Sequence, residues 1–274
     1  MVKLRSEQEL ELMRESGRIT AVALKKVLES VKVGVTGLEL DQIAEEEMKS
    51  QGAQSSFKTV EGYRWTICVT VNEQVVHGIP TTSALKEGDI VSIDLGALYK
   101  GWHTDAAWSV LVTAGHPEQS EGSVANATSN KLRDPSSSTQ DDKSRFLAVG
   151  EEALWLGIKQ AVDGNKIGDI SEAIQKKVEG FGYSIVRSLV GHGVGEELHE
   201  DPEVPGYGRA GTGMVLKSGM TIAIEVIYNM GKPEVLLDKD GWTIISADES
   251  LAGLFEMSII VGKEKAKILT DWRN

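Results

Sequence analysis

Two related stretches decide the fold: KEGDIVSID at 86–94 and KSGMTIAIE at 217–225. Each begins with a Lys-x-Gly turn, continues as an apolar strand and ends on a carboxylate, Asp94 or Glu225. A carboxylate buried in a sheet costs several kcal/mol unless a cation or hydrogen-bond donors satisfy it. The repeated pattern therefore predicts two halves that bring acids to one shared cation site.

The repeat extends beyond the strands. Apolar spacing predicts a helix at 7–31, and Thr36 with Glu39 resembles a capping box that opens a second helix ending near Ser50. A similar layout follows about 130 residues later, where Gly34 corresponds to Gly164. We infer one α+β domain over 1–274, a pseudo-two-fold arrangement in which strands meet across the axis and helices cover one face. Chance matching of amphipathic patterns is the alternative.

The halves are expected at about 7–114 and 144–262. The predicted strands are 66–71, 90–95 and 106–113 in the first half, and 184–189, 221–228, 243–247 and 254–261 in the second.

The segment between the halves, about 115–143, is rich in Ser, Asn, Asp, Gly and Thr and has few large apolar residues. This composition predicts a flexible, exposed loop, with His116 solvated rather than catalytic. A long loop can also be an active-site lid, which is the alternative for this segment.

Composition narrows the class of protein. The hydrophobic fraction is 41% and the charged fraction 26%, as in soluble globular proteins, and the net charge of −12 argues against a nucleic-acid surface. The single cysteine, Cys68, excludes an internal disulfide and fits a reducing compartment. We find no apolar run long enough to span a membrane and no signal-peptide pattern at the start, so we expect a cytoplasmic protein without membrane contact.

Four acids lie within apolar strands. Asp94 and Asp105 are eleven positions apart, joined by a segment at 96–101 that suits a hairpin aiming both acids at one point. Glu225 and Glu256 each interrupt an apolar run. Any one of them could be an ordinary strand-end residue, but the four together favour a common site.

Three of the five histidines also have unusual settings. His192 lies in Gly-His-Gly-Val-Gly at 191–195, His199 follows seven residues later, and His77 precedes a Gly-x-Pro turn. A histidine at a strand end is more often structural, but glycines on both sides permit close backbone approach and favour a ligand role for His192. The glycine pattern does not match a dinucleotide fingerprint.

These residues predict a metal centre. Its expected ligands are four carboxylates and one imidazole, which suit Mn²⁺, Fe²⁺, Co²⁺ or Zn²⁺: Asp94, Asp105, His192, Glu225 and Glu256. Four carboxylates balance two divalent ions, which can bridge a water and lower its pKa toward neutrality, giving a hydroxide nucleophile. His77 and His199 stay free to donate hydrogen bonds to a substrate carbonyl or leaving nitrogen.

The same seven positions resemble, in order and spacing, the signature of methionine aminopeptidases, a dinuclear-metal family with the pita-bread fold. The matching motifs cover about 5–270 apart from the polar loop. The resemblance implies an antiparallel sheet covered by helices and removal of the initiator methionine from proteins with a small second residue. The short stretch between Glu200 and Glu225 resembles the type I branch.

The resemblance also implies roles for single residues. His77 and His199 would assist at the scissile amide, and Glu225 would add a proton-shuttle role to its metal contact. A methionine pocket would be lined by Tyr63, Cys68, Leu198 and Trp242. The implied partners are nascent polypeptide N-termini, with the ribosome as a further candidate, and the chain is expected to be a monomer.

Four residues depart from the family pattern, Trp108, Val226, Met257 and Ser258, and the loop at 115–143 is longer than usual. Substitutions around metal ligands can change metal affinity by about 10–100-fold. Two alternative functions remain. One is a binding protein of the same fold with impaired catalysis. The other is a proline-directed aminopeptidase, a class with a separate N-terminal domain that we do not expect here. A generic metal-binding module is a third, disfavoured by the two unliganded histidines.

Overall fold

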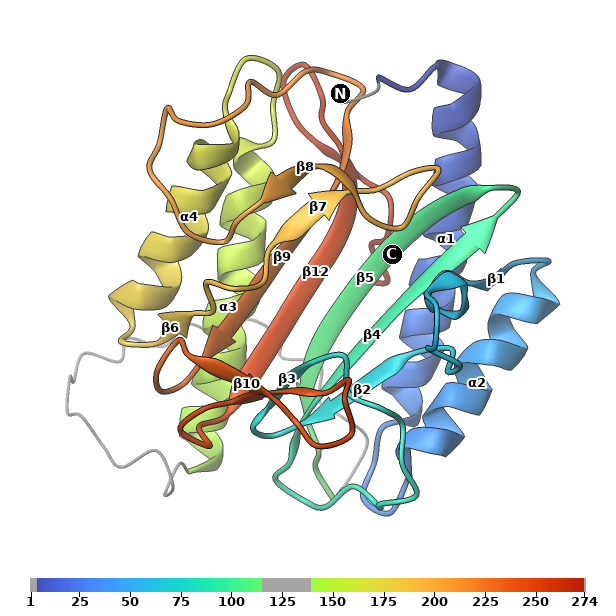
Figure 1. The fold of residues 1–274 in the computed structure, drawn as a ribbon, viewed down its shortest axis with the longest axis vertical. Helices are drawn as coiled ribbons and strands as arrows, with labels where there is room; N and C mark the ends of the chain where they lie inside the picture. The colour runs from blue at the N-terminus through green and yellow to red at the C-terminus, as the bar shows by residue number, and fades with distance from the viewer. Residues whose placement is uncertain (1–3, 115–138, 274) are drawn as a thin grey trace.

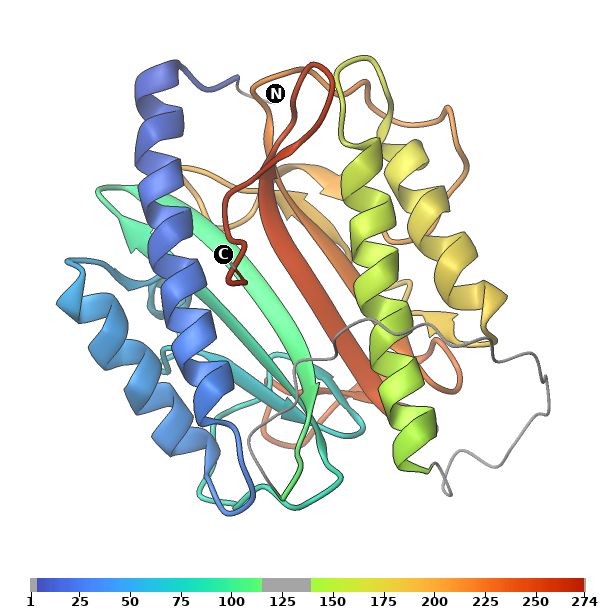
Figure 2. The same ribbon diagram turned by 180° about the vertical axis from the view of Figure 1, so that it is seen from behind.

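A computed structural model describes residues 4–114 and 139–273. Figures 1 and 2 show a central antiparallel sheet with four helices on one face. The helices are α1 (Glu7–Ser30), α2 (Gly37–Ser50), α3 (Gln140–Gln160) and α4 (Ile167–Gly180). None of the helices in the described ranges is long and apolar enough to cross a membrane.

The main sheet has the strand order β1-β4-β5-β12-β9-β7-β8, with β2, β6 and β13 attached to its sides. Its strands are β1 (Gln54–Ser55), β2 (Cys68–Val71), β4 (Ile90–Tyr99), β5 (Trp102–Leu111), β6 (Ser184–Ile185), β7 (Gly191–Gly193), β8 (Glu200–Val204), β9 (Thr221–Asn229), β12 (Ala252–Ile260) and β13 (Lys267–Ile268). A second sheet of β3 (Gln74–Val76), β10 (Val235–Leu237) and β11 (Ile244–Ser246) lies beside it, and a short 3₁₀ helix spans Phe57–Thr59.

The two halves have matching architecture, as the repeat predicts. Helix α1 packs on β4 and β5 with α2 beside it, and in the same way α3 packs on β9 and β12 with α4 beside it. In the main sheet the halves join where β5 pairs with β12, at two positions: Ala107 opposite Glu256, and Ala106 opposite Met257. In the second sheet they join where β3 pairs with β11. Figure 2 shows α1 and α3 on either side of the junction between β5 and β12. The predicted α+β class with a pseudo-two-fold repeat is therefore confirmed.

Local sequence explains where the helices begin. In α2 the Thr36 hydroxyl accepts from the Glu39 backbone N–H (3.3 Å), and the Glu39 carboxylate accepts from the Thr36 N–H (2.8 Å), which is the predicted capping box. At the start of α4 one of the two hydrogen bonds of a capping box is present: the Asp169 carboxylate accepts from the Lys166 N–H at 2.7 Å. Helix α3 begins at Gln140, so the end of the predicted polar loop belongs to a helix capped by Thr139. The remainder of that loop, with His116, lies outside the described residues.

The strand predictions are right in position but not in extent: β6 is only Ser184–Ile185 of the predicted 184–189, because the chain leaves the sheet after pairing with β9 at two positions, whereas β4 and β5 are longer than predicted. The expected connector at 96–101 is mostly strand: β4 continues to Tyr99, β5 begins at Trp102, and the turn is only Lys100-Gly101. Both turn residues have positive φ, 49° and 87°, as a two-residue hairpin turn of this type requires. The strands β1, β3, β7, β8, β10 and β13 were not predicted; each has two to five residues, too few to show a periodic pattern.

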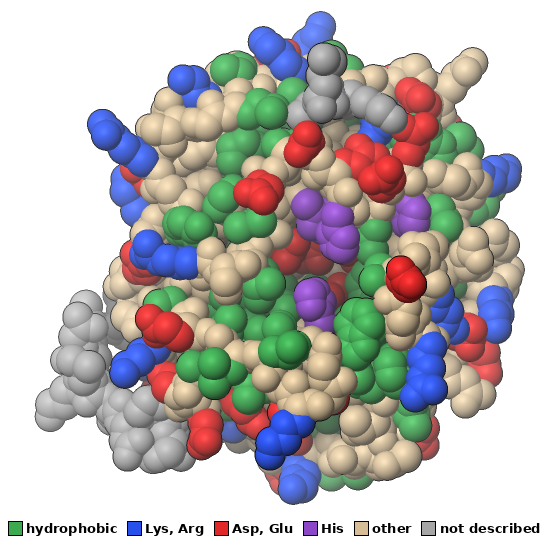
Figure 3. All heavy atoms as spheres, in the orientation of Figure 1, with side chains coloured by type: hydrophobic (Ala, Val, Ile, Leu, Met, Phe, Trp, Pro, Cys, Tyr) green, Lys and Arg blue, Asp and Glu red, His purple; other side chains and the backbone are tan. Residues whose placement is uncertain are grey.

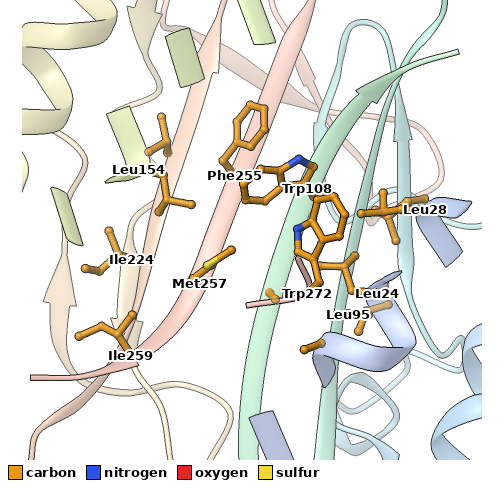
Figure 4. Packing of buried hydrophobic residues seen from close by; sticks show 14 of the residues in the cluster. Leu24, Leu28, Leu95, Trp108, Leu154, Ile224, Phe255, Met257, Ile259 and Trp272 are labelled. Atoms are coloured by element: carbon orange, nitrogen blue, oxygen red, sulfur yellow. The ribbon is translucent and has the colours of Figure 1, made fainter. Parts of the chain in front are cut away.

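Alternation along the strands separates an apolar face from a polar one. In β12, Phe255, Met257 and Ile259 point toward the helices and join the main core (Figure 4), whereas Glu256 points to the opposite face. In β9, Ile224 and Val226 do the same around Glu225. Each acid thus interrupts an apolar run because its neighbours face the helices and it does not.

Close packing of α1 against the C-terminal segment generates a prediction. A Cβ at Gly17 would lie 2.4 Å from the Leu269 carbonyl oxygen, whereas a Cβ at Gly180, in α4, would meet nothing within 4 Å. We expect Gly17→Ala to lower the free energy of unfolding by about 1–3 kcal/mol, because backbone must shift to admit the methyl group. Gly180→Ala is the matched control and should leave stability unchanged or slightly higher. Urea unfolding of both variants measures this, and equal stabilities would contradict the packing described.

Candidate metal centre

The sheet register brings the predicted acids into one row. Asp94 on β4 lies opposite Ala107 on β5, Ala107 lies opposite Glu256 on β12, and Glu256 lies opposite Glu225 on β9. Asp105 is two residues before Ala107 and so points to the same face. The methyl group of Ala107 is the only side chain between the acids in this row, which leaves space at its centre.

His192 completes the group from the neighbouring strand. On β7 it lies opposite Ala223, two residues from Glu225. Its Nε2 is 3.5 Å from a Glu225 carboxylate oxygen and 4.0 Å from one of Glu256. Its Nδ1 is 2.8 Å from the Gly193 carbonyl oxygen, so Nδ1–H donates there and the unprotonated Nε2 faces the acids. All five predicted ligands are thus brought together.

Burial of the cluster shifts its protonation equilibria. Burial raises the pKa of Asp94, Glu225 and Glu256 well above the usual range, and repulsion from neighbouring carboxylates, chiefly that of Asp105, adds to this. Burial raises the pKa of Asp105 to about 7. The pKa of His192 falls to about 4, mainly through burial, so its ring is neutral near pH 7 and its contacts with the glutamates are not ion pairs.

Two buried oxygens test whether a cation fits. Asp94 Oδ1 and Glu256 Oε1 are buried and have no hydrogen-bond partner among the described residues. Ligand atoms of Asp105, His192 and Glu256 lie within 4.8 Å of one another, close enough to hold one ion. Orphaned carboxylate oxygens beside a neutral imidazole are suitable donors for a divalent cation of the first transition series. The residues therefore fit a divalent metal.

The backbone of Asp105 is fixed by Ser258. The Ser258 hydroxyl accepts from the Asp105 N–H and donates to the Asp105 carbonyl, both at 2.8 Å. The Ser258 N–H in turn donates to the Thr270 hydroxyl at 3.1 Å, which links the site to the C-terminal segment. The junction of β5 and β12, where two backbone pairs are formed, is reinforced by these side-chain bonds.

Three of the four residues that depart from the family pattern lie away from the acids, whereas the fourth, Ser258, bonds the backbone of Asp105. Trp108, Val226 and Met257 face the helices and belong to the main core. Trp108 packs edge-on against Phe255 at 4.9 Å between ring centroids and against Trp272 at 5.4 Å (Figure 4). These substitutions alter packing behind the sheet and leave the metal-facing side chains in place.

A hollow opens over the acid cluster. Figure 3 shows histidine side chains around a depression in which acidic atoms are visible. His77 directly follows β3 with a φ of 58°, and His199 lies beside His192, with 4.4 Å between ring centroids. Both rings are exposed at the mouth, and neighbouring protein atoms that displace water lower the pKa of each, so both are neutral near pH 7.

Apolar and aromatic side chains line the other wall of the same cavity of about 150 Å³. The four predicted pocket residues are among them: Tyr63, Cys68, Leu198 and Trp242. Tyr63 packs edge-on against Trp242 at 5.1 Å, and its hydroxyl donates to the Ile67 carbonyl and lies 3.2 Å from Cys68 Sγ. Burial raises the pKa of the Cys68 thiol, so it stays neutral and acts as an apolar surface.

Three further lining residues were not predicted: Val76, which ends β3, together with Phe57 and Val60. Phe57 and Val60 lie in and directly after the short 3₁₀ helix, where the chain has neither helical nor strand periodicity. The only sequence signal near them is the aromatic content of 57–65, which includes Phe57, Tyr63 and Trp65.

Comparisons with known proteins agree with this geometry. The sequence profile described as metallopeptidase family M24 matches residues 11–255. Methionine aminopeptidase 1 of Bacillus subtilis (strain 168) is 41% identical over 98% of this chain and 99% of its own length. The crystal structure of methionine aminopeptidase from Thermotoga maritima superimposes with a TM-score of 0.87 at 37% identity, covering 98% of this chain and 99% of that one.

The fold is shared more widely. Prolidase from Pyrococcus horikoshii OT3 matches with a TM-score of 0.71 and 22% identity, and this chain covers 63% of it. At that identity the likeness concerns the fold alone.

The raised carboxyl pKa values predict a pH dependence for metal-free protein. A carboxyl group whose folded-state pKa is raised binds more protons in the native than in the unfolded chain, so it destabilises the fold as pH rises through this interval. For Asp105 the interval runs from 3.8 to about 7. Metal-free Asp105→Asn protein should therefore gain stability relative to the unsubstituted chain as pH rises from about 4 to about 7. Urea unfolding at both pH values measures the difference, and a constant or shrinking difference would contradict the assigned shift.

Proposed function

The chain belongs to metallopeptidase family M24, and from this premise we propose that it is a methionyl aminopeptidase that removes N-terminal methionine from proteins and peptides with a small second residue. One observation carries the proposal: a small apolar pocket opens directly onto the acid cluster, so that a bound side chain would place its own amide over the acids. The whole cavity, including the space over the acids, has a volume of about 150 Å³, and a cavity of this size accepts a ligand such as benzene, so a side chain as small as that of methionine fits.

We propose Asp94, Asp105, His192, Glu225 and Glu256 as the ligands of two divalent ions, drawn from Co, Mn, Fe and Zn. Four carboxylates balance the charge of two such ions, and the neutral imidazole offers a fifth donor. When bound, divalent ions supply a hydroxide nucleophile near neutral pH and polarise a carbonyl oxygen. Outer contacts keep the ligands in place: Gly193 fixes the ring of His192, and Ser258 fixes the backbone of Asp105.

The remaining polar groups suit the other steps of amide hydrolysis. Neutral His77 and His199 carry N–H donors at the mouth, where they would hold the scissile carbonyl oxygen and the amide nitrogen. Glu225 would hold the proton released by the attacking water and pass it to the departing amine. Tyr63, Cys68, Leu198 and Trp242 would exclude water around the methionine side chain.

The natural substrates that we propose are the N-termini of newly made proteins, met in the cytoplasm as they leave the ribosome. We further propose that the whole chain, 1–274, acts as one catalytic domain and as a monomer, because both halves contribute ligands to a single site.

A cleavage assay tests the activity. Chelator-treated protein is reloaded in turn with Mn²⁺, Co²⁺, Fe²⁺ and Zn²⁺ and offered peptides that begin Met-Gly, Met-Ala, Leu-Ala or Ala-Pro. We expect metal-dependent release of free methionine from the first two only. Preferential cleavage of Ala-Pro would assign the chain to the proline-directed branch, and bound metal without any cleavage would favour a binding protein of this fold.

Single substitutions test the ligand assignment. We expect His192→Ala and Glu225→Gln to reduce kcat/KM by more than about a thousandfold, because each removes a metal donor and Glu225 also carries the proton. Circular dichroism and a count of bound metal by atomic emission would show a retained fold with less metal. Lys239→Ala, at an exposed position in the turn that follows β10, is the matched control and should keep full activity. Near-normal turnover in either ligand variant would refute the assignment.

A further inference from the structure

A buried arginine lies beneath the loop that carries Leu198 and His199. Arg5 directly precedes Ser6, the N-cap of α1, and its side chain is only 2% exposed. Arginine is seldom buried to this degree without partners, because the desolvation of its charge must be offset. Its partners therefore indicate what it does.

The guanidinium of Arg5 contacts the loop that joins β7 to β8. It forms an ion pair with Glu200, lies 3.6 Å from a carboxylate oxygen of Glu196 and sits 5.1 Å over the ring of Trp102. Gly195 permits this approach, since a Cβ there would be 2.2 Å from Arg5 Nη2. The loop is thus shaped around the arginine head group.

Glu200 connects the arginine to the active-site side chains. One of its carboxylate oxygens meets Arg5, and the other accepts from the Glu197 N–H at 3.1 Å. It begins β8 and directly follows His199 in the chain. At the other end of the loop, the Gly195 carbonyl accepts from the His103 N–H at 2.7 Å.

The loop that carries His199 is therefore fixed at both ends. At Gly195 it is fixed by a backbone hydrogen bond from His103, and at Glu200 by the ion pair with Arg5. His199 itself is exposed, and its ring contact is with His192. Arg5 supplies a fixed anchor, because its backbone is held at the capped start of α1 and its N–H donates to the Gly219 carbonyl at 3.4 Å.

We propose that Arg5 is a positioning residue that places the His199 imidazole over the metal centre by fixing Glu200. This inference rests on the role proposed above for His199. Without the guanidinium, Glu200 keeps only its bond within the loop, from the Glu197 N–H, and the loop loses its tie to α1, so His199 leaves its working position. The metal ligands are carried by β4, β5, β7, β9 and β12, so metal binding should persist.

A double-mutant cycle separates positioning from general stabilisation. We measure kcat/KM on a Met-Ala peptide for the unsubstituted chain, Arg5→Ala, His199→Ala and the double variant. A displaced catalytic group costs about 10–100-fold, so we expect Arg5→Ala to lower kcat/KM in that range with unchanged metal content. In the His199→Ala background the same change should cost at least about fivefold less, since the group that it positions is already gone.

Equal losses in both backgrounds would overturn the proposal, because a purely structural role does not depend on His199. Arg14→Ala is the matched control: Arg14 also lies at the start of the chain, but its ion pairs with Glu7 and Glu11 are on the exposed side of α1, and its removal should change kcat/KM less than about twofold.

Arg5→Lys provides a second variant in case Arg5→Ala does not fold. It keeps the charge and loses the planar fork that pairs with a carboxylate, so we expect a smaller loss of kcat/KM with the same dependence on His199.

The proposed role of His199 and the proposed role of Arg5 are refuted by different results. If His199→Ala alone retains full activity, the proposed role of His199 fails. If His199→Ala is impaired while both Arg5 variants are fully active, only the role of Arg5 fails.

Discussion

Burial of four carboxylates on one face of a sheet is the constraint on which the rest of this structure depends. So much buried negative charge is tolerated only when a cation compensates it or when protons remain bound. The raised pKa values of the four carboxyl groups show that they retain protons more readily than exposed ones do. The opposite face must then supply the stability. It does so through an almost continuous apolar layer, from Leu24 on α1 through Trp108 to Phe255 and Leu154 on α3 (Figure 4). The helices are needed behind the sheet because the front is occupied by charge.

The repeat explains how a sequence can specify this arrangement. Side chains alternate between the two faces of a strand, so in Ile224-Glu225-Val226 the two apolar residues face the helices and the acid lies on the opposite face. Strand register then does the rest, since Asp94, Glu256 and Glu225 fall on one line across four strands. The capping pair of Thr36 and Glu39 marks a helix start by local chemistry alone. These features were predictable because each depends on neighbours in the sequence.

Features that depend on distant contacts were less accessible. The strands β7 and β8 are short and rich in glycine or charge, so their pairing becomes evident only when Gly191 is seen opposite Val204. The pocket residues Tyr63 and Trp242 lie in irregular segments far apart in the chain, and their selection rested on a family resemblance rather than on any pattern. Arg5 gave no signal, because a basic residue before a helix is ordinary, and Phe57 gave only the weak signal of the aromatic content of 57–65. Their importance follows from Tyr63 and Glu200, which only the fold places beside them.

Because β5 and β12 pair at only two positions, the metal centre would also have a structural role. Two of its five side chains, Asp94 and Asp105, belong to the first half, and the other three belong to the second. Metal held by these five side chains would join segments 87 to 162 positions apart. Because the unfolded chain does not form the site, the free energy of binding the metal would add to the stability of the folded state. The metal needed for catalysis would then also hold the two halves of the fold together.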